Sequence, residues 1–579
     1  MSREKTIAIV SWLGVLILIA AFLGPVWKNY SGSVVGPFGG IDAMLQLGLL
    51  EWSARHWSNV SHWLNLPIFF PVPGALGFMD SLLGQAWMVL PVRWLFSPSV
   101  AGLYNTAYLG SLLLAAAGMA TLWLASGGSR WAAGVAALAL IGAPYTHAQI
   151  GHLNQLPPPF VLFSFAALTA ALRRQNAGLS TGQFWWMLGV GLVLQAAWGW
   201  YGFAYTVIGV AVLKTAWLVH RFRRRTADGA LFLSVIKKTI LPFAVMVVAV
   251  WFLAQPQLQL GHRYTDFQRA ENEVRAGSAD IQHFFNRGVY RSGPADWIGK
   301  GLSGEERYLG RERQVLHPGW FALALFAVGW WRRGYLTFQR RRFGRALLVM
   351  GVIGLVLAFG QSIGVPGTSH RLPLPLDLIR EMAPPFKAFR GVWRFSWLMV
   401  VALAWWSAVG VEQLVQKYQT GFRRWAAPLV PMVLLFLLSM PAAVPSVQVP
   451  LDGRVENQGM VTGAVLTLPA PATEYDEDRT EALWLVRSLT TGLPVTGGAT
   501  GWVPPEVRLL RTRLLNCEEG NESAGKLFQE MRADGIELVE IAIRPGDEKR
   551  VTFWRDALKQ ARAERIFYWA QTGYEMYRF

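Results

Sequence analysis

The sequence predicts a polytopic α-helical membrane protein with about eleven transmembrane helices and a C-terminal extracytoplasmic α/β domain. Two observations lead to this class. Of the 579 residues, 53% are hydrophobic and only 16% are charged, whereas about a quarter of the residues in a soluble protein are charged. The apolar residues also gather in stretches that approach the length of a bilayer core. The 28 tryptophans fit a chain with many membrane interfaces.

The first element is the segment MSREKTIAIVSWLGVLILIAAFLG, a short basic head followed by a long apolar run. It contains no clear small-x-small cleavage site with a polar continuation, so we expect an uncleaved first span with its N-terminus in the cytoplasm. The candidate spans in order are 6–25, 101–125, 131–147, 157–172, 184–199, 201–219, 238–255, 319–331, 346–362, 394–415 and 425–446.

Basic residues in the connecting segments predict the orientation of these spans. The segments assigned to the cytoplasm contain 20 of them but only two acids, Glu4 and Asp228. This is the bias of the positive-inside rule, so the net charge of +18 does not indicate a nucleic-acid partner. The basic residues are Arg3, Lys5, Arg130, Arg173, Arg174, Arg221, Arg223, Arg224, Arg225, Lys237, Lys238, Arg332, Arg333, Arg340, Arg341, Arg342, Arg345, Lys417, Arg423 and Arg424.

The same topology places three long loops, 26–100, 256–318 and 363–393, outside the membrane. Loops of this length commonly carry function. The first has helical spacing over 42–56 and over 80–96, the latter broken at Pro91, and we expect both helices to lie along the membrane surface. The alternative is that 80–96 forms a further span.

The domain prediction is a membrane domain over 1–446 and a soluble extracytoplasmic α/β domain over 447–579, where charged residues return. The predicted helices of this second domain are 524–534 and 552–563, and its predicted strands are VTGAVLTLP and IELVEIAI. The single cysteine, Cys517, excludes an internal disulfide framework.

The predicted spans contain almost no ionisable residues. Lys214 and Glu412 lie near cytoplasmic ends, where long side chains reach water. A coupled transporter usually needs ionisable groups near the middle of the membrane, whereas the acids of this chain lie at the outer boundary. That distribution favours chemistry on an amphiphile whose head group is in water.

The loop sequences resemble bacterial polytopic glycosyltransferases of the GT-C superfamily. The likeness covers Phe70 to Phe160, with FFPVPGALGFMDSLLGQAWMVLPVRWLF, YNTAYLGSLLLAAAGM and GSRWAAGVAALALIGAPYTHAQIGHLNQLPPPF. PPFKAFRGVWRFSWLMVVALAWW at 384–406 is similar to a late loop-to-helix junction in such proteins. GGATGWVPPEVRLL at 497–510 looks like a strand–turn element of their outer domain.

This resemblance implies transfer of a sugar from a polyprenyl-phosphate carrier at the outer face of the membrane, usually with inversion. It also implies a catalytic carboxylate in the first outer loop. Asp42 occupies that place, flanked by Ile41 and Ala43 instead of a second acid. Such a transfer needs a base for the acceptor hydroxyl and a positive group or metal for the leaving phosphate.

Asp42 is therefore the candidate base or metal-ligating acid, and Asp80 is a second candidate catalytic group. For both, the alternative role is a helix N-cap. A divalent metal, Mg²⁺ or Mn²⁺, could bind through Asp42, Asp80 and a histidine, although no compact ligand motif is present.

The candidate substrate-binding residues lie in three outer segments. His152, Asn154 and Gln155 belong to the polar turn THAQIGHLNQLP, which could equally be an ordinary turn before a proline-marked helix start. Arg390 and Arg394, in FRGVWRF, could bind a lipid phosphate or anionic head groups. Further candidates near the ends of the middle loop are Arg263, Arg269 and His317.

The leading hypothesis is a glycosyltransferase of the bacterial inner membrane. Its partners would be a polyprenyl-phosphate-linked sugar, membrane lipids and a glycan, lipid or protein acceptor of the cell envelope. The alternatives are a translocase of lipids or lipid-linked sugars and a non-catalytic envelope assembly protein.

Overall fold

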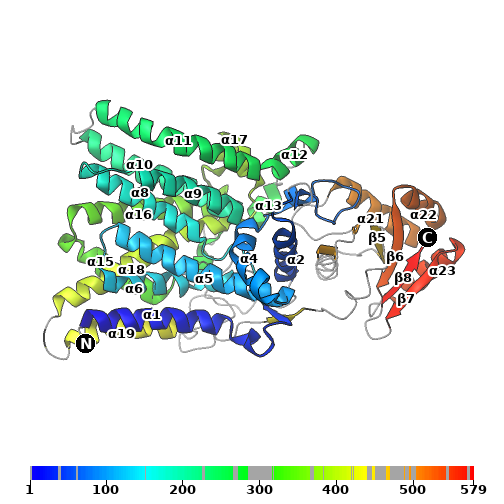
Figure 1. Ribbon diagram of the computed structural model, residues 1–579, viewed down its shortest axis with the longest axis horizontal. Helices are drawn as coiled ribbons and strands as arrows, with labels where there is room; N and C mark the ends of the chain where they lie inside the picture. The colour runs from blue at the N-terminus through cyan, green and yellow to red at the C-terminus, as the bar shows by residue number, and fades with distance from the viewer. Residues whose placement is uncertain are drawn as a thin grey trace. The chain divides into compact units, whose positions relative to one another are not determined.

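The computed structural model divides the chain into two compact units (Figure 1). The first unit contains Met1–Lys28, Asn105–Ala254 and Tyr264–Pro445, and the second contains Asn29–Tyr104, Gln255–Arg263 and Ser446–Phe579. The second unit is thus larger than the predicted tail domain, since it also includes most of the first outer loop. The residues described are 3–36, 41–59, 63–149, 151–223, 229–264, 271–284, 316, 318–364, 371–382, 384–418, 420, 423–439, 446–449, 464–469, 488–489, 494–496, 504–542, 547–569 and 574–579.

The first unit is a helical bundle, and each of the eleven predicted spans overlaps at least one of its helices. These helices are α1 (Arg3–Phe22), α5 (Val100–Ala125), α6 (Ala133–Ile141), α7 (Pro144–Ala148), α8 (Pro159–Asn176), α9 (Gly182–Trp198), α10 (Trp200–Arg223), α11 (Gly229–Leu253), α15 (Trp320–Trp331), α16 (Phe338–Ala358), α18 (Trp397–Lys417) and α19 (Arg423–Ser439).

Short elements connect the bundle helices. They are η3 (Arg130–Ala132), α13 (Glu271–Ala276), η4 (Ile281–Phe284), η7 (Arg333–Tyr335), the paired strands β2 (Ser362–Gly364) and β3 (Arg371–Pro373), α17 (Leu376–Met382), η8 (Pro384–Ala388) and η9 (Val392–Ser396). The segment η1 (Gly24–Asn29) leads out of α1.

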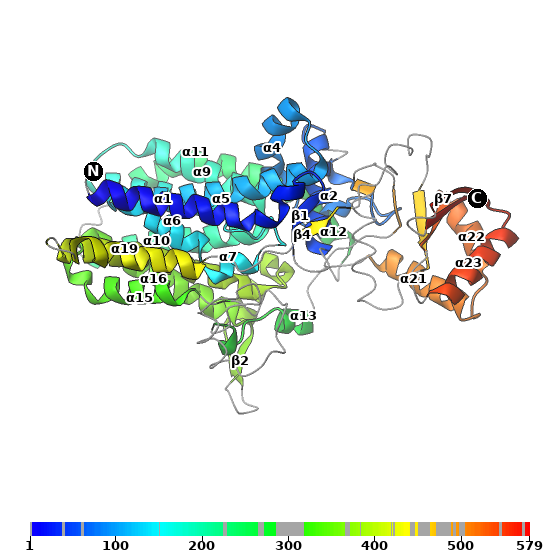
Figure 2. The same ribbon diagram turned by 90° about the horizontal axis from the view of Figure 1, so that it is seen from below.

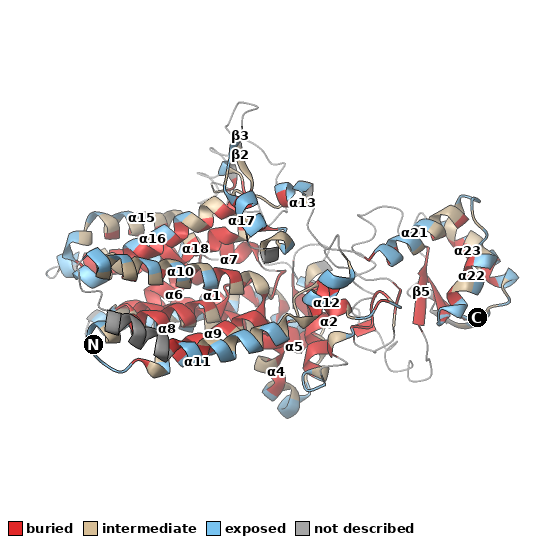
Figure 3. Cartoon of the chain, turned by 90° about the horizontal axis from the view of Figure 1, so that it is seen from above, coloured by how far each residue is buried: buried red, intermediate tan, exposed pale blue. Residues whose placement is uncertain are grey.

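Helix α18 forms the centre of the bundle and packs against α6, α15, α16 and α19. Most of it is buried, as is the whole of α6 (Figure 3). A glycine permits its close crossing with α15, since a Cβ at Gly410 would collide with the Leu325 carbonyl oxygen. Helices α1, α6 and α19 lie side by side along one flank (Figure 2).

The apolar helices make the chain a multi-pass membrane protein. Among the described residues, four helices are long and apolar enough to cross a bilayer, and a fifth qualifies if α11 and the following α12 form one broken span. Shorter apolar helices include those at Arg130–Ile141, Trp320–Trp331 and Ala426–Ser439. The total of about eleven spans remains a prediction.

The turns predicted to be cytoplasmic meet at one end of the bundle. Arg340 forms an ion pair with the buried Glu412 at 2.7 Å, and the Ser129 amide donates to the same carboxylate at 3.2 Å. Arg342 donates to the Ala216 carbonyl at 2.7 Å. These contacts bring the described parts of the turns near residues 129, 216, 340 and 412 to a common end of the bundle.

The second unit contains the first outer loop with α12. Its elements outside the C-terminal sheet are β1 (Ser33–Val35), α2 (Ile41–His56), η2 (Ala75–Phe78), α4 (Leu83–Phe96), α12 (Gln255–Arg263) and β4 (Ser446–Gln448). Strands β1 and β4 pair antiparallel. Helix α12 crosses η2 at Gly77, where a Cβ would lie 2.5 Å from the Pro256 carbonyl oxygen.

The tail of the second unit folds around a four-stranded sheet with the order β5-β6-β8-β7. Strands β5 and β6 are parallel and the other two pairs are antiparallel. The elements are β5 (Ala464–Leu468), α21 (Pro505–Glu518), α22 (Ala524–Ala533), β6 (Ile536–Ala542), α23 (Glu548–Gln560), β7 (Glu564–Trp569) and β8 (Tyr574–Arg578).

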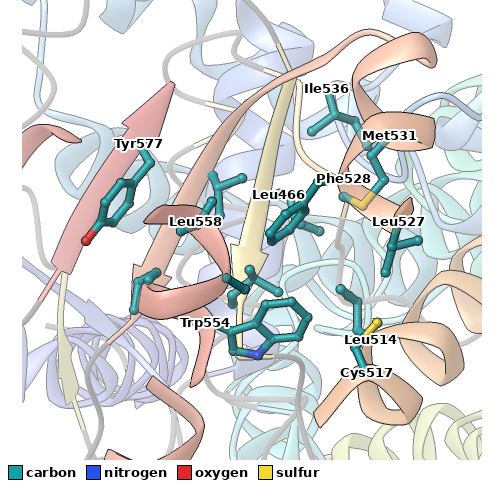
Figure 4. Packing of buried hydrophobic residues seen from close by; sticks show 14 of the residues in the cluster. Leu466, Leu514, Cys517, Leu527, Phe528, Met531, Ile536, Trp554, Leu558 and Tyr577 are labelled. Atoms are coloured by element: carbon teal, nitrogen blue, oxygen red, sulfur yellow. The ribbon is translucent and has the colours of Figure 1, made fainter. Parts of the chain in front are cut away.

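Apolar side chains from the sheet and its helices form the core of this tail (Figure 4). Trp554 of α23 packs against Phe528 of α22 with ring centroids 5.7 Å apart. Burial raises the pKa of the Cys517 thiol to about 11, so the single cysteine is a protonated core residue. Phe70 of the first outer loop packs against the same core.

Two local predictions are wrong. Helix α4 continues through Pro91 to Phe96, because a proline removes one backbone donor but need not end a helix whose neighbours hold it in place. The resemblance to a strand–turn element at 497–510 fails from Pro505 onward, where the chain is helical with a proline in the first turn, while residues 497–503 lie outside the described residues.

Candidate functional site

Asp42 lies in the first turn of α2 and is half-buried. The alternative role for Asp42 was the N-cap of this helix. The helix begins at Ile41, one residue earlier, so Asp42 is not the N-cap residue. An acid in a first turn interacts favourably with the helix dipole. Its charge also acts on the hydroxyl of Tyr104. Tyr104 is fully buried, and its hydroxyl has no hydrogen-bond partner among the described residues. Tyr104 belongs to the same unit as Asp42.

A buried ion pair fixes α2 to α4. The carboxylate of Glu51, 3% exposed, accepts from both terminal nitrogens of Arg93, at 2.6 Å from Nη1 and 3.1 Å from Nη2. It also accepts from Nε of Arg55, one turn along α2, at 2.7 Å. We call Glu51, Arg93 and Arg55 the α2–α4 clamp. Two parallel bonds from one guanidinium specify geometry as well as adding energy, so the clamp fixes the helix that carries Asp42.

Glu51 is not among the residues predicted from the sequence. One signal was present, because Glu51 and Arg55 are spaced four residues apart on a helix predicted to be mostly apolar. The partner that buries the charge, Arg93, is 42 residues away, and only the packing of α2 against α4 brings the two together.

Asp80 lies two residues before the N-cap of α4 and is half-buried. The N-cap residue is Leu82, with φ of 51°, and its side chain makes no capping hydrogen bond. Asp80 is therefore not the N-cap residue that the alternative considered. Its neighbour Ser81 fixes the segment, since the Ser81 carbonyl accepts from the buried Ser53 hydroxyl of α2 at 2.6 Å.

In the first unit, Arg394 of η9 lies against two aromatic rings. Its Cζ is 5.0 Å from the centroid of the Tyr201 ring and 5.3 Å from that of Trp393. The Tyr145 hydroxyl donates to the Arg394 carbonyl at 3.1 Å. We call Arg394, Tyr201, Trp393 and Tyr145 the Arg394 cage. Cation–π contacts hold a guanidinium through its flat face, whereas an anion is bound by the N–H donors along its edge.

The backbone around the cage is closely packed. The Gly391 amide donates to the Tyr201 hydroxyl at 2.8 Å, and the Trp393 amide donates to the Gly277 carbonyl at 3.1 Å. A Cβ at Gly277 would collide with the Arg390 carbonyl oxygen, so only glycine allows this approach. Segments near residues 145, 201, 277 and 391 therefore fix Arg394 together.

The polar turn after α7 is largely buried. His152 and Gln155 are 9% and 5% exposed, and Asn154 is half-buried. Gln149 is fully buried, and neither of its side-chain amide atoms has a partner among the described residues. An unsatisfied buried amide costs about 1–3 kcal/mol, which is typical of a group that water or a ligand satisfies. Tyr145, four residues before Gln149, connects this segment to Arg394.

The other predicted phosphate contacts differ in their surroundings. Arg390 is exposed. Arg263 lies at the end of α12 and forms an ion pair with Glu506 of α21 at 3.6 Å, with both side chains more than 40% exposed. Exposed pairs of this kind are weak. Arg269 and His317 lie outside the described residues.

The described residues do not form a metal-binding cluster. No three His, Cys, Asp or Glu side chains among them lie close enough to hold one ion. The metal hypothesis required Asp42, Asp80 and a histidine to lie together. Within the described part of the chain, no such group of three is present.

Comparison with known proteins gives a fold but no sequence family. Neither the scan against protein families nor the search of curated proteins found a match. Among solved structures, the apo oligosaccharyltransferase of Archaeoglobus fulgidus aligns with a TM-score of 0.51 and 13% identity, over 95% of this chain and 71% of its own. The arabinofuranosyltransferase AftD from Mycobacteria aligns with a TM-score of 0.56 and 13% identity, over all of this chain.

The names of both neighbours describe glycosyltransferases, and the shared backbone fold agrees with the predicted polytopic, GT-C-like helical architecture. The number of spans and the predicted C-terminal domain stay predictions. This chain spans only 40% of the length of AftD. At 13% identity the likeness describes the path of the backbone, not the identity of the side chains at a site.

Proposed function

We propose that this chain is a membrane glycosyltransferase that takes its sugar from a lipid-linked phosphate donor. One observation supports this most strongly: its backbone follows that of two glycosyltransferases over at least 95% of its length. The names of these neighbours specify different transferred groups, an oligosaccharide and an arabinofuranose. The proposal therefore concerns the reaction class and leaves the sugar open.

Asp42 is the proposed base, as the GT-C resemblance implies for an acid in the first outer loop. In the transfer, the carboxylate takes the proton from an acceptor hydroxyl while that oxygen attacks the anomeric carbon. The new carbon–oxygen bond forms as the bond to the donor phosphate breaks, and the leaving phosphate retains the bonding electron pair. The clamp at Glu51 supports this role, because it fixes the helix that carries Asp42.

Arg394 is the proposed contact for the donor phosphate, with Arg390 as a second. Its position beside the rings of Tyr201 and Trp393 favours this role, because the ring contacts pre-order a flexible side chain before any ligand arrives.

The polar segment after α7 is proposed to bind sugar or acceptor hydroxyls through Gln149, His152, Asn154 and Gln155. Each role is assigned from the surroundings of the residue in its own unit. The proposed steps use only groups of this chain, and a divalent metal could assist by neutralising the leaving phosphate.

The proposed setting is the outer face of a bacterial inner membrane. A polyprenyl carrier would keep its chain among the bundle helices while its phosphate stays in water. The acceptor would be a glycan, lipid or protein of the cell envelope, and the C-terminal sheet would help to select it.

The direct test of this function is a donor competition. Membranes containing the protein are incubated with an envelope extract and either radiolabelled polyprenyl-phosphate hexoses and pentoses or the matching nucleotide sugars, with membranes lacking the protein as the control. We expect label to move from at least one lipid-linked donor, with release of polyprenyl phosphate, and not from the nucleotide sugars. Transfer from nucleotide sugars alone, or from neither class, would contradict the proposal.

A further inference from the structure

The turn that follows α13 lies between the end of α16 and the backbone of the Arg394 cage. We call residues 277–279 the α13 turn. On one side the Ala279 amide donates to the Ala358 carbonyl at the end of α16 at 2.8 Å. On the other side the Gly277 carbonyl accepts from the Trp393 amide at 3.1 Å. The α13 turn therefore connects a bundle helix to the segment that carries Arg394.

Contacts with α13 and with the end of α16 hold the α13 turn in place. The Gly277 amide donates to the Glu273 carbonyl at 2.8 Å, and the Ser278 hydroxyl donates to the carbonyl of the buried Val274 at 2.7 Å. Gly360, which has a φ of 74°, lies so close that a Cβ there would collide with the Ser278 hydroxyl oxygen. These contacts fix the turn independently of the cage.

Gly277 is the point at which the α13 turn meets the cage backbone. Besides colliding with the Arg390 carbonyl oxygen, a Cβ at this position would lie 2.8 Å from the Arg390 carbonyl carbon and 3.2 Å from Gly391 Cα. The φ of Gly277 lies outside the left-handed region, so this contact alone excludes a side chain. A side chain here would push the backbone at Arg390 and Gly391 away from the turn.

Tyr201 transmits such a displacement to the guanidinium. Its hydroxyl accepts from the Gly391 amide at 2.8 Å, and its ring centroid lies 5.0 Å from Cζ of Arg394. A shift of Gly391 therefore moves or releases a ring that supports the face of the Arg394 side chain. The position of Gly277 is in this way linked to the direction in which Arg394 presents its N–H donors.

We propose that Gly277 is a positioning residue for the donor phosphate, because it seats the backbone at Arg390 and Gly391 and so directs the Arg394 guanidinium. The inference rests on the proposed function and adds to it a residue that acts through Arg394. Paired hydrogen bonds from a planar guanidinium to phosphate require a fixed orientation. The alternative role for Gly277 is packing alone, which predicts lower stability without a changed preference for a charged ligand.

The test measures the affinity of the full-length protein, in an uncharged detergent, for polyprenyl phosphate and for the uncharged polyprenol of the same chain length. The ratio of the two affinities isolates the contribution of the phosphate. The variants are Gly277→Ala, Arg394→Gln and the two combined. The matched control is Gly261→Ala, a glycine of the same predicted outer loop whose Cβ would have nothing within 4 Å.

We expect Gly277→Ala to lower the preference for the phosphate by about tenfold or more, as expected for a lost hydrogen bond to a charged group. Gly261→Ala should stay within about twofold of the wild type. The combined variant should bind no more weakly than Arg394→Gln, because residues that act as one unit give non-additive losses.

The outcomes separate this inference from the proposed function. Additive losses, or an unchanged preference in Gly277→Ala alongside a loss in Arg394→Gln, would show that Gly277 does not position Arg394 and would leave the proposed function standing. An unchanged preference in Arg394→Gln would contradict both the phosphate role of Arg394 and the inference.

A measurement on the wild type covers the case in which Gly277→Ala does not fold. Binding at a positioned guanidinium favours the arrangement that positions it, and this linkage is reciprocal. Polyprenyl phosphate should therefore slow hydrogen exchange of the Ala279 amide, which bonds to α16 on the far side of the turn, whereas polyprenol should not. Exchange at the same rate with and without polyprenyl phosphate would overturn the proposal.

Discussion

Replacing Asp42 by asparagine is expected to lower kcat/KM for glycosyl transfer by about 10²–10⁴-fold. The amide is the same size as the carboxylate and keeps a side-chain oxygen in the first turn of α2, but it cannot take up the proton of an acceptor hydroxyl. Initial rates of label transfer from the polyprenyl-phosphate donor measure the effect. The unfolding midpoint should stay near that of the wild type, because Asp42 is half-buried and an acid in a first turn adds little beyond its interaction with the helix dipole.

The matched control is Asp377→Asn in α17, an acid of another predicted outer loop whose carboxylate accepts from Gln361 at 2.7 Å. It undergoes the same chemical change and should leave the rate within about twofold of the wild type, since a surface substitution of this kind has little effect. A comparable loss in both variants would mean that the assay responds to outer charge in general and that Asp42 has no specific role.

Replacing Glu51 by leucine is expected to cost about 1.5–3 kcal/mol in the local stability of the α2–α4 pair, because Arg93, whose side chain is 28% exposed, loses its charge-assisted contact with a buried carboxylate. Here Arg93 would lose both of its hydrogen bonds to the carboxylate. Hydrogen exchange of the α2 and α4 backbone amides measures this local stability directly. Transfer activity should fall with it, since the helix that carries Asp42 would no longer be fixed.

Two further variants distinguish the contribution of the Glu51–Arg93 pair from that of the more exposed Glu51–Arg55 pair. Arg55→Ala removes the partner whose side chain is 39% exposed, and should cost less than about 1 kcal/mol. Glu51→Leu/Arg93→Met removes both charges and should restore much of the lost protection, because a buried pair can often be replaced by apolar residues of similar volume. Unchanged protection in Glu51→Leu would show that the pair does not hold α2 against α4.

The helices were largely predictable because each contains a long apolar run between charged turns. The start of α8 at Pro159 and the end of α5 at Ala125 agree with the predicted spans within two residues. The strands at 464–468 and 536–542 were predictable because they contain Val, Thr and Ile, which favour strands. The path through Pro91 was not, because the contact that joins the helix beyond Pro91 to α2, the Arg93–Glu51 ion pair, involves a residue 42 positions away in the sequence.

The surroundings of the candidate site were much less predictable. Arg394 was chosen from its position alone, whereas the rings that hold it include Tyr201, which is 193 residues away in the sequence. Hydrophobic periodicity records which face of a helix is buried, but it does not record which distant segment covers that face. For the same reason the Glu51–Arg93 pair could not be found without the packing of α2 on α4.

The most direct test of the central claim, that the Asp42 carboxylate performs the chemical step, is a single-turnover measurement. Wild type and Asp42→Asn are loaded with a radiolabelled polyprenyl-phosphate sugar, acceptor extract is added, and the release of free polyprenyl phosphate is followed by rapid quenching. We predict that both proteins bind the donor with similar affinity and that only the wild type releases polyprenyl phosphate at an appreciable rate. Release by Asp42→Asn at the wild-type rate would contradict the claim.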